Sequence, residues 1–476
     1  MKKSVIRITC FLVILTMVLW YANKIFKFKY GDGIYSMTKF YELEDNTVDV
    51  LFLGSSHAFE SFNTGTLWDE YGMSTYVLGG SVQPMWNTYY YLKEALKTQT
   101  PKLIVLEGYM TSYTSEFSDD SRIIKNTFGM RWTKDKVDAI KISTPESRYN
   151  EFLMEYPQYH MRYSELSRED FFVNQGNPFF ENWKGFGCNM ITTAFEAPDV
   201  SDVTERQPLY EKSEEYYRKT IELAIAHNIP IMVVVTPYAG ITAEVQAMYN
   251  TASDIATEYG VQFINYNLIY EQIGIDFSTD AADTDHLNYR GNVKLSKDVG
   301  RLIQEKYGVP DHRGDNDYQT WQDNADYVRT MIENQQLTEI YDVSAYIDKI
   351  RNPNYRIVIS LDGNCSFANG FAEQFLLENV DNGVSGIWYR NNEDCSVWSV
   401  RGAEGEKYWR MDSHDLCLRI SFDELTQTYT NHIIMDNAEY KIVGKGLNIF
   451  VYDTITQSIV DIAGVDVGNP YSLVRQ

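Results

Sequence analysis

Residues 48–57 have the sequence VDVLFLGSSH, and this stretch gives the first indication of the fold. Apart from Asp49, the run from Val48 to Leu53 is apolar, and it ends at Gly54, a residue that favours turns. The run therefore predicts a buried strand that passes into a loop. That loop presents the hydroxyl group of Ser56 at the end of the strand.

Four further apolar runs follow, with helical patterns between them. We expect strands at residues 74–78, 102–106, 229–235 and 261–264, and helices at residues 86–96, 216–227, 243–259 and 289–307. Strands that alternate with helices indicate a parallel sheet covered on both faces. The predicted class is therefore a three-layer α/β fold.

A second polar block, DTDHLN at residues 283–288, lies beyond the last of these strands. Asp283 precedes His286 by three positions, close enough for its carboxylate to orient the imidazole ring. A serine, a histidine base and an orienting carboxylate together turn a weak hydroxyl into a nucleophile. We therefore predict a catalytic triad of Ser56, His286 and Asp283. Asp283 is preferred to Asp285 as the orienting carboxylate. Asp285 is adjacent to His286 in the chain, and the side chains of adjacent residues diverge.

The polar candidates all follow predicted strands. Ser56 follows the first strand, Gly80 the second, Thr236 the fourth, and residues 283–286 the fifth. Ligands of parallel α/β sheets bind beyond the carboxyl ends of the strands. The sequence therefore predicts one active site at that edge of the sheet.

Residues 52–57, FLGSSH, resemble the nucleophile block of the SGNH/GDSL hydrolases, and Asp283 to His286 resemble their final block. The resemblance covers about residues 45–306. It implies a flavodoxin-like sheet and a serine esterase or O-acyltransferase that needs no cofactor. The most similar branch is membrane-anchored, and it includes the D-alanyl-transfer protein of lipoteichoic acid synthesis and the alginate O-acetylation proteins.

Two departures from the family concern the oxyanion site. Ser55 stands where the family usually has Asp, and we expect it to hydrogen-bond the loop. No Asn stands at residues 107–110, where the family's oxyanion-hole Asn falls. The expected oxyanion donors are the backbone N–H of Ser56, the backbone N–H of Gly80 or Ser81, and the Gln83 side-chain amide. We expect His57 to be structural, with its side chain directed away from that of Ser56.

The N-terminus predicts a membrane anchor. An uncharged stretch runs from Ile8 to Ala22, flanked by Arg7 and Lys24. Fifteen residues at 1.5 Å each span roughly 22 Å, less than the ~30 Å hydrocarbon core, so the flanking cations must snorkel. The bulky residues that follow lack a cleavage signal, which favours an uncleaved anchor over a cleaved signal peptide. The family resemblance favours a single-pass protein of the cell membrane with most of the chain outside the cytoplasm.

The chain is long enough for further domains. We expect the anchor at residues 1–30, the α/β domain at 45–307, a polar linker at 308–324 and a β-rich α+β domain at 325–476. Residues 444–453 in the last domain resemble an interleukin-like domain. An insertion at about 111–210 is rich in aromatic residues and is expected to form a lid, an acceptor groove or a small packed subdomain. These aromatic residues are Tyr156, Tyr159, Tyr163, Phe171, Phe172, Phe179, Phe180, Trp183 and Phe186.

Composition narrows the choice of partners. A formal net charge of -24 argues against nucleic acid, because phosphate binding needs a basic face. The 36 tyrosines and 9 tryptophans suit sugar rings as well as packed cores. Five cysteines without Cys-x-x-Cys spacing argue against a zinc site. A disulfide among Cys365, Cys395 and Cys417 is left open.

Together these features predict a membrane-anchored serine esterase or O-acyltransferase that acts on acyl esters of a cell-envelope glycan. Both reactions use the same residues, so the sequence does not separate them. A multi-span membrane acyltransferase is an expected partner. The alternative is a catalytically degenerate protein of the same fold that binds the polysaccharide or scaffolds its modification.

Overall fold

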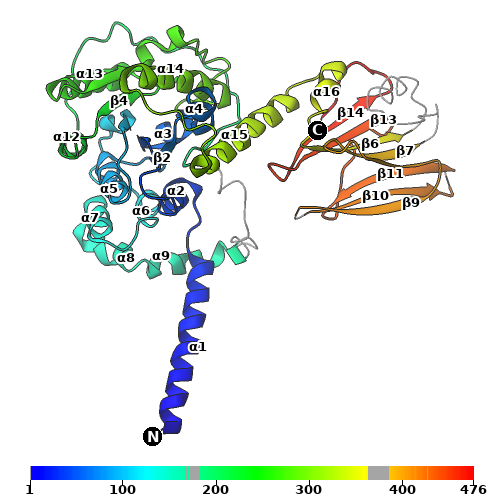
Figure 1. Ribbon diagram of the computed structural model, residues 1–476, viewed down its shortest axis with the longest axis horizontal. Coiled ribbons are helices and arrows are strands. Elements are labelled where there is room, and N and C mark those ends of the chain that lie inside the picture. The colour runs from blue at the N-terminus through cyan, green and yellow to red at the C-terminus, as the bar shows by residue number, and fades with distance from the viewer. Residues whose placement is uncertain are drawn as a thin grey trace. The chain divides into compact units, whose positions relative to one another are not determined.

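The computed structural model describes residues 2–166, 170–171, 183–362, 385–412, 414–425 and 427–475 (Figure 1). The chain divides into two compact units, Met1–Val328 and Arg329–Gln476. Phe172, Phe179 and Phe180 of the predicted insertion, and Cys365, lie outside the described residues.

The first unit is built on a five-stranded parallel sheet. Its strands are β1 (Val50–Gly54), β2 (Thr75–Gly79), β3 (Leu103–Glu107), β4 (Ile231–Val235) and β5 (Gln262–Asn265). The strand order is β2-β1-β3-β4-β5, and all neighbours are parallel. This is the flavodoxin-like doubly wound order, so the predicted α/β fold is confirmed.

The central strands are buried throughout, as expected for strands covered on both faces. Alternate side chains of β1 enter two different cores, Leu51 and Leu53 one and Val50 and Phe52 the other. Helices α5 (Met85–Ala95), α12 (Glu211–Ala226) and α13 (Ala243–Glu258) close the first core, and α14 (Tyr289–Tyr307) closes the second. The sheet is therefore the middle of three layers.

The described helices of this unit that precede residue 308 are α1 (Lys2–Phe26), α2 (Ser36–Phe40), α3 (Ser56–Ser61), α4 (Thr64–Tyr71), α5 (Met85–Ala95), α6 (Asp120–Thr127), α7 (Lys134–Ser143), α8 (Tyr149–Leu153), α9 (Tyr156–Met161), α12 (Glu211–Ala226), α13 (Ala243–Glu258) and α14 (Tyr289–Tyr307). Four of them, α5, α12, α13 and α14, match the expected helices, although α12 begins five residues earlier than expected. Helices α6 to α9 belong to the predicted insertion.

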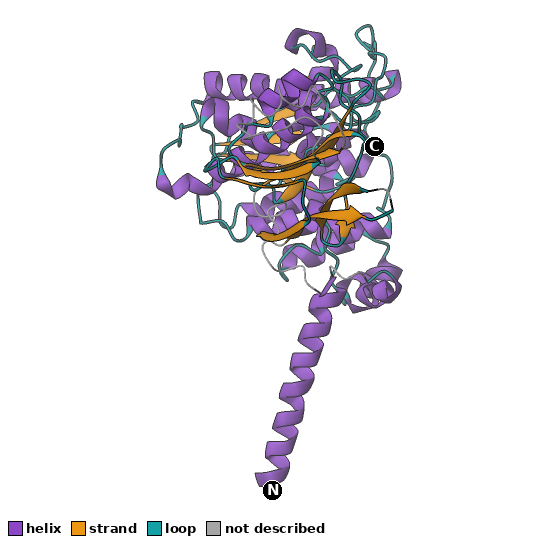
Figure 2. Ribbon diagram, turned by 90° about the vertical axis from the view of Figure 1, so that its right-hand side faces the viewer, coloured by secondary structure: helices purple, strands orange, loops and turns teal. Residues whose placement is uncertain are grey.

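Helix α1 is one continuous helix (Figure 1, Figure 2). Within it, Val5–Phe26 is apolar enough to cross a membrane; its most apolar 18 residues have a mean hydropathy of 2.1, and none of these 18 residues is buried. Its 22 residues rise about 33 Å, so the apolar helix is longer than the uncharged stretch alone suggested. By length and composition it suits either an anchor or a signal sequence.

Lys184 and Gly185 of the insertion lie against β2, which is an edge strand of the sheet. The backbone N–H of Val77 in β2 donates to the Lys184 carbonyl at 3.0 Å. Gly185 has a φ of +79°, and a Cβ there would lie 1.8 Å from the Val77 carbonyl oxygen. Only glycine allows this close approach, which gives an edge strand the pairing that it would otherwise lack.

The second unit is β-rich, as predicted. It contains the C-terminal part of α15 (Gln319–Thr338), α16 (Val343–Lys349), β6 (Tyr355–Asp362), β7 (Gly386–Asn391), β8 (Val397–Arg401), β9 (Gly405–Met411), β10 (His414–Asp423), β11 (Thr428–Met435), β12 (Ala438–Glu439), β13 (Gly446–Asp453) and β14 (Ser458–Asp466). The strands of this unit form two antiparallel sheets, β14-β13-β6-β7-β8 and β12-β11-β10-β9. A hydrophobic core lies between the two sheets. Strands of both sheets are orange in Figure 2.

Residues 308–324 pack on the first unit, where a polar linker was expected. Trp321 is only 2% exposed, and its Nε1 donates to the Thr75 carbonyl at 2.9 Å. Residues 319–324 already belong to α15. Because the segment is polar in composition, its one buried tryptophan was not expected to pack on the first unit.

Cys395 and Cys417, for which a disulfide was left open, are free thiols.

Candidate active site

Ser56 is the first residue of α3, directly after β1. The turn between them is tight, because a Cβ on Gly54 would lie 2.7 Å from Cβ of Glu107 and 3.0 Å from Cβ of Ala58. Glycine is therefore required where the strand passes beside β3. The turn leaves the Ser56 hydroxyl at the carboxyl edge of the sheet.

The loop before α14 holds His286 in a defined orientation. Asp283 Oδ1 accepts the backbone N–H groups of Asp285 at 2.8 Å and of His286 at 2.9 Å. The carboxylate oxygens also lie 2.9 and 3.0 Å from His286 Nδ1. Asn288 caps the start of α14, because its side chain accepts the N–H groups of Arg290 and Gly291.

Electrostatics favour one tautomer of the imidazole ring. Burial raises the pKa of Asp283, but hydrogen bonds from the His286 ring and from the backbone N–H groups of Asp285 and His286 outweigh it, so that the pKa lies below its usual value. The carboxylate is therefore ionised at neutral pH and accepts the Nδ1–H bond. Nε2 of His286 is left as an acceptor.

The structure brings the three predicted triad residues together. His286 Nε2 lies 2.8 Å from Ser56 Oγ, although the two residues are 230 positions apart in the chain. With Nδ1 protonated, the serine hydroxyl donates to Nε2, which is the geometry of a nucleophile beside its base. Asp285 makes no described contact with the ring; its Oδ2 accepts a long bond of 3.4 Å from Thr284 Oγ1.

His57 packs beside this group, in agreement with a structural role. Its ring stacks on Tyr109 at 3.5 Å, and its Nδ1 lies 3.2 Å from Thr236 Oγ1. Burial and then the nearby His286 ring hold the pKa of His57 well below its usual value. The His57 ring is therefore neutral.

Two of the expected oxyanion donors are already bonded elsewhere. The Ser81 N–H donates to Asp32 Oδ2 at 2.9 Å, and the Ser81 hydroxyl bonds the same carboxylate. Gln83 is fully buried, and its Nε2 donates to Thr88 Oγ1 at 3.1 Å. The expectation is corrected for the Ser81 N–H, whereas the Gln83 amide keeps a second N–H and its role stays a prediction. Sequence reasoning missed Asp32 because it lies 49 positions before Ser81.

A second correction concerns Ser55. Its hydroxyl was expected to hydrogen-bond the loop, but it is buried without a partner among the described residues. It also makes no capping bond to α3. The N–H groups of Ser56 and Gly80 remain as proposed oxyanion donors.

Glu107, at the end of β3, was not predicted as part of the site. Burial raises its pKa to about 8, against the opposing effect of backbone N–H bonds from Tyr109 and Thr236. Its Oε1 accepts the Tyr109 N–H at 2.9 Å, and its Oε2 has no partner within the described ranges. A neutral carboxylic acid therefore lies beneath the turn that carries Ser56.

Residues 187–195 of the insertion, the bridging segment, join the serine helix to the histidine loop. The Gly187 N–H donates to the Phe59 carbonyl at 2.8 Å, and the Thr193 N–H to the Ala281 carbonyl at 3.0 Å. The Tyr289 N–H donates back to the Asn189 carbonyl at 2.9 Å. Backbone hydrogen bonds of this segment thus connect α3 to the loop that carries His286.

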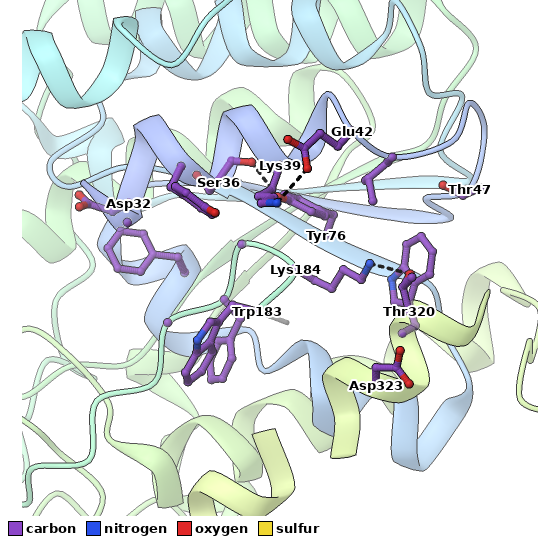
Figure 3. Close-up of a pocket in the computed structure, with 18 of the residues that line it drawn as sticks. Asp32, Ser36, Lys39, Glu42, Thr47, Tyr76, Trp183, Lys184, Thr320 and Asp323 are labelled. Carbon is purple, nitrogen blue, oxygen red and sulfur yellow. Dashed lines mark hydrogen bonds and ion pairs between the residues drawn. The ribbon is translucent and has the colours of Figure 1, made fainter. Parts of the chain in front are cut away.

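A cavity of about 780 Å³ lies beside α3 (Figure 3). Phe59 and Glu60 of α3 line one side of this cavity, together with Ser81 from the loop after β2. The aromatic side chains on its walls are Tyr35, Phe59, Tyr76, Trp183, Phe186 and Trp321. Lys184 donates to Thr320 Oγ1 at 2.8 Å, and burial lowers the pKa of Lys184 to about 8 although Asp323 opposes this.

No protein-family model matches the chain, and a search of curated proteins finds no match. Among solved structures, the chain is similar to a candidate acylhydrolase from Bacteroides fragilis, with 10% identity over 59% of this chain and 100% of that chain and a TM-score of 0.30. It is also similar to a GDSL-like lipase from Bacteroides thetaiotaomicron, with 13% identity over 54% and 87% of the two chains and a TM-score of 0.27. A gut microbial diltiazem-metabolizing enzyme matches with 11% identity over 56% and 47% and a TM-score of 0.25. At this level of similarity the matches carry no argument about activity, so the fold rests on the strand order and the site on its contacts.

Proposed function

We propose that this protein is an SGNH-type serine esterase or O-acyltransferase. One observation carries the proposal: Ser56 Oγ lies 2.8 Å from His286 Nε2 while His286 Nδ1 lies 2.9 Å from the Asp283 carboxylate. This arrangement joins nucleophile, base and orienting group in one chain of hydrogen bonds.

In the proposed reaction, His286 takes the hydroxyl proton as Ser56 Oγ attacks an ester carbonyl. Asp283 stabilises the imidazolium that forms, and the N–H groups of Ser56 and Gly80 stabilise the oxyanion. His286 then donates the proton to the leaving alcohol. The acyl group on Ser56 passes to water in an esterase, or to a sugar hydroxyl in a transferase, with His286 again acting as base.

For the substrate, we propose acyl esters of a cell-envelope glycan. Tyr35 and Phe59, the half-buried aromatic side chains of the cavity beside α3, support this, because aromatic faces stack on sugar rings. Helix α1 supports it too, because an anchor would hold the site next to the envelope. A multi-span membrane acyltransferase would then supply the acyl group for a transfer reaction.

The second candidate function is glycan binding by a degenerate site. It is favoured by the bonds that already occupy the Ser81 N–H and the Gln83 amide. Loss of one oxyanion donor costs an enzyme about 10²–10³ in rate. If the N–H groups of Ser56 and Gly80 did not stabilise an oxyanion either, the protein would keep its fold and its cavity but would not catalyse the reaction.

The test is hydrolysis of p-nitrophenyl acetate by the purified full chain. Ser56→Ala should lower the rate at least a thousandfold, because the nucleophile is lost. Ser201→Ala, at an exposed loop position, should leave it unchanged. A Ser56→Ala rate equal to that of the wild type would favour the binding function. Loss or gain of acetyl groups on an envelope glycan, followed by NMR, distinguishes esterase from transferase.

A further inference from the structure

A cationic cavity of about 610 Å³ lies where α1 ends. Its lining includes five cations, Lys24, Lys27, Lys29, Arg131 and Lys136, and only two carboxylates, Glu42 and Glu155. Such a concentration of positive charge is unusual in a chain whose formal net charge is -24. It needs an explanation other than the protein's average composition.

The two carboxylates neutralise only one of the five cavity cations, because Glu155 pairs with Lys136 while Glu42 pairs with Lys39, which is not in the lining. Lys29 pairs with Asp170 at 2.8 Å.

Three cations of the cavity are left without a carboxylate partner in the part of the chain that the structure describes. They are Lys24, Lys27 and Arg131. The Arg131 guanidinium donates to the Tyr41 carbonyl and lies 4.2 Å from the centre of the Tyr41 ring. Its remaining N–H groups and the two ammonium groups can bind an anion.

The apolar part of α1 places these cations at a defined depth. Trp20 and Tyr21 near its end are 65% and 53% exposed, and such residues prefer the interface between hydrocarbon and headgroups. Lys24 follows Trp20 by four residues, which is roughly 6 Å along α1, and Lys27 is the first residue after α1 ends. That distance corresponds to the headgroup layer of a bilayer.

A second surface lies at the same end of α1. Helix α9 contacts α1, and Arg162, just after α9, donates to the Phe26 carbonyl at 3.1 Å (Figure 1). Large side chains around α8 and α9 are between 63% and 71% exposed: Trp132, Met154, Tyr156, Met161 and Tyr163. Exposed aromatic and methionine side chains beside a membrane helix suit contact with the lipid interface.

We propose that this cavity binds the phosphate of an anionic membrane lipid headgroup. The ammonium groups of Lys24 and Lys27 and the Arg131 guanidinium donate to the phosphate oxygens, and the lipid chains lie along the apolar surface of α1. The exposed side chains around α8 and α9 enter the same interface. The inference rests on α1 being a membrane segment and does not depend on the triad.

The experiment uses the full chain in a neutral detergent. Dissociation constants are measured by microscale thermophoresis for dioctanoyl phosphatidylglycerol, dioctanoyl phosphatidylcholine and glycerol 3-phosphate. The wild type should bind the anionic lipid at least tenfold more tightly than the zwitterionic lipid, and added salt should reduce the difference. Glycerol 3-phosphate should bind much more weakly than the anionic lipid, because it lacks the chains.

Variants identify the site. Lys27→Gln with Arg131→Gln should reduce the affinity for phosphatidylglycerol to that for phosphatidylcholine. Lys407→Gln with Lys445→Gln makes the same charge change at exposed positions of the second unit and should keep the preference. Ser56→Ala should bind lipid as the wild type does, which separates this result from any failure of the proposed function.

Equal affinities for the two lipids in the wild type would overturn the proposal. So would an unchanged preference in the Lys27 and Arg131 double variant. Binding of glycerol 3-phosphate as tight as that of phosphatidylglycerol would assign the cavity to a soluble phosphate and would exclude the lipid.

Discussion

At the residue scale, the Asp283 carboxylate both shapes its loop and orients His286. Asp283→Asn keeps an oxygen for the backbone N–H groups of Asp285 and His286, but it removes the charge that fixes the Nδ1–H tautomer. We expect kcat to fall by up to about 10⁴, by analogy with the serine protease triad. Ester hydrolysis at pH 7, with thermal melting as a check on folding, measures the effect.

Asp285→Asn is the matched control, because the Asp285 side chain makes no described contact with the imidazole ring. It should change kcat less than about threefold. A crippled Asp285→Asn beside a normal Asp283→Asn would show that the orienting carboxylate is misassigned.

Glu107 makes stability depend on pH. Burial raises its pKa from 4.5 to about 8, so the folded protein holds a proton that the unfolded chain loses near pH 4.5. This stabilising contribution is complete below pH 4.5 and is lost as pH rises to about 8. Between pH 5 and pH 8 the free energy of unfolding should fall by an amount on the order of 3 kcal/mol for this group alone.

Glu107→Gln should remove this slope, because the amide keeps an acceptor for the Tyr109 and Thr236 N–H groups and has no proton to lose. Urea unfolding of wild type and variant at the two pH values measures it, with the exposed Glu271→Gln as a control. An equal loss of stability between pH 5 and pH 8 in wild type and Glu107→Gln would show that Glu107 does not cause the pH dependence.

The triad residues could be predicted because their positions follow local rules. Ser56 follows the end of β1 by two residues, and Asp283 reaches His286 within one turn of the same loop. The occupancy of the Ser81 N–H could not be predicted, since the bond to Asp32 exists only after two distant segments meet.

At the scale of elements, periodicity and turn residues were sufficient for all five parallel strands and for α14, whose bounds match the expectation. The stretch beside β2 was not foreseen as a partner of the sheet. Its pairing depends on the contact between Lys184 and Val77, and no local pattern of residues encodes that contact.

Gly185 tests this stretch. Gly185→Ala places a Cβ 1.8 Å from the Val77 carbonyl oxygen at a positive φ, so the chain must move away from β2. We expect a loss of at least about 3 kcal/mol in the free energy of unfolding and a weaker ester hydrolysis, because the bridging segment follows directly.

Gly260→Ala is the control that measures the cost of a side chain at a positive φ without a steric contact. Gly260 has a φ of +68° but no atom within 4 Å of the added Cβ. It should cost only about 1 kcal/mol. Equal losses in the two variants, measured by urea unfolding, would show that the contact with β2 contributes nothing.

At the scale of the whole molecule, the first unit extends to Val328 and not to the glycine after α14. The β-rich character of the second unit followed from alternating strands. The boundary did not, because the segment before it is polar in composition and carries Trp321 in its buried face.

Two truncations test this boundary. A chain that ends at Val328 should keep ester hydrolysis and melt as the first unit of the full chain does. A chain that ends at Gly308 lacks Trp321 and the Lys184–Thr320 bond, and it should melt many degrees lower. Inactivity of a well-folded chain ending at Val328 would show that the second unit contributes to the site.

In the proposed function, the His286–Asp283 pair activates Ser56. The most direct measurement is intact-protein mass spectrometry after incubation of the full chain with a fluorophosphonate. The account predicts one phosphonyl adduct per chain, mapped by peptide analysis to Ser56, absent from Ser56→Ala and strongly slowed in His286→Ala. A folded wild type that gains no adduct, or an adduct on another serine, would contradict it.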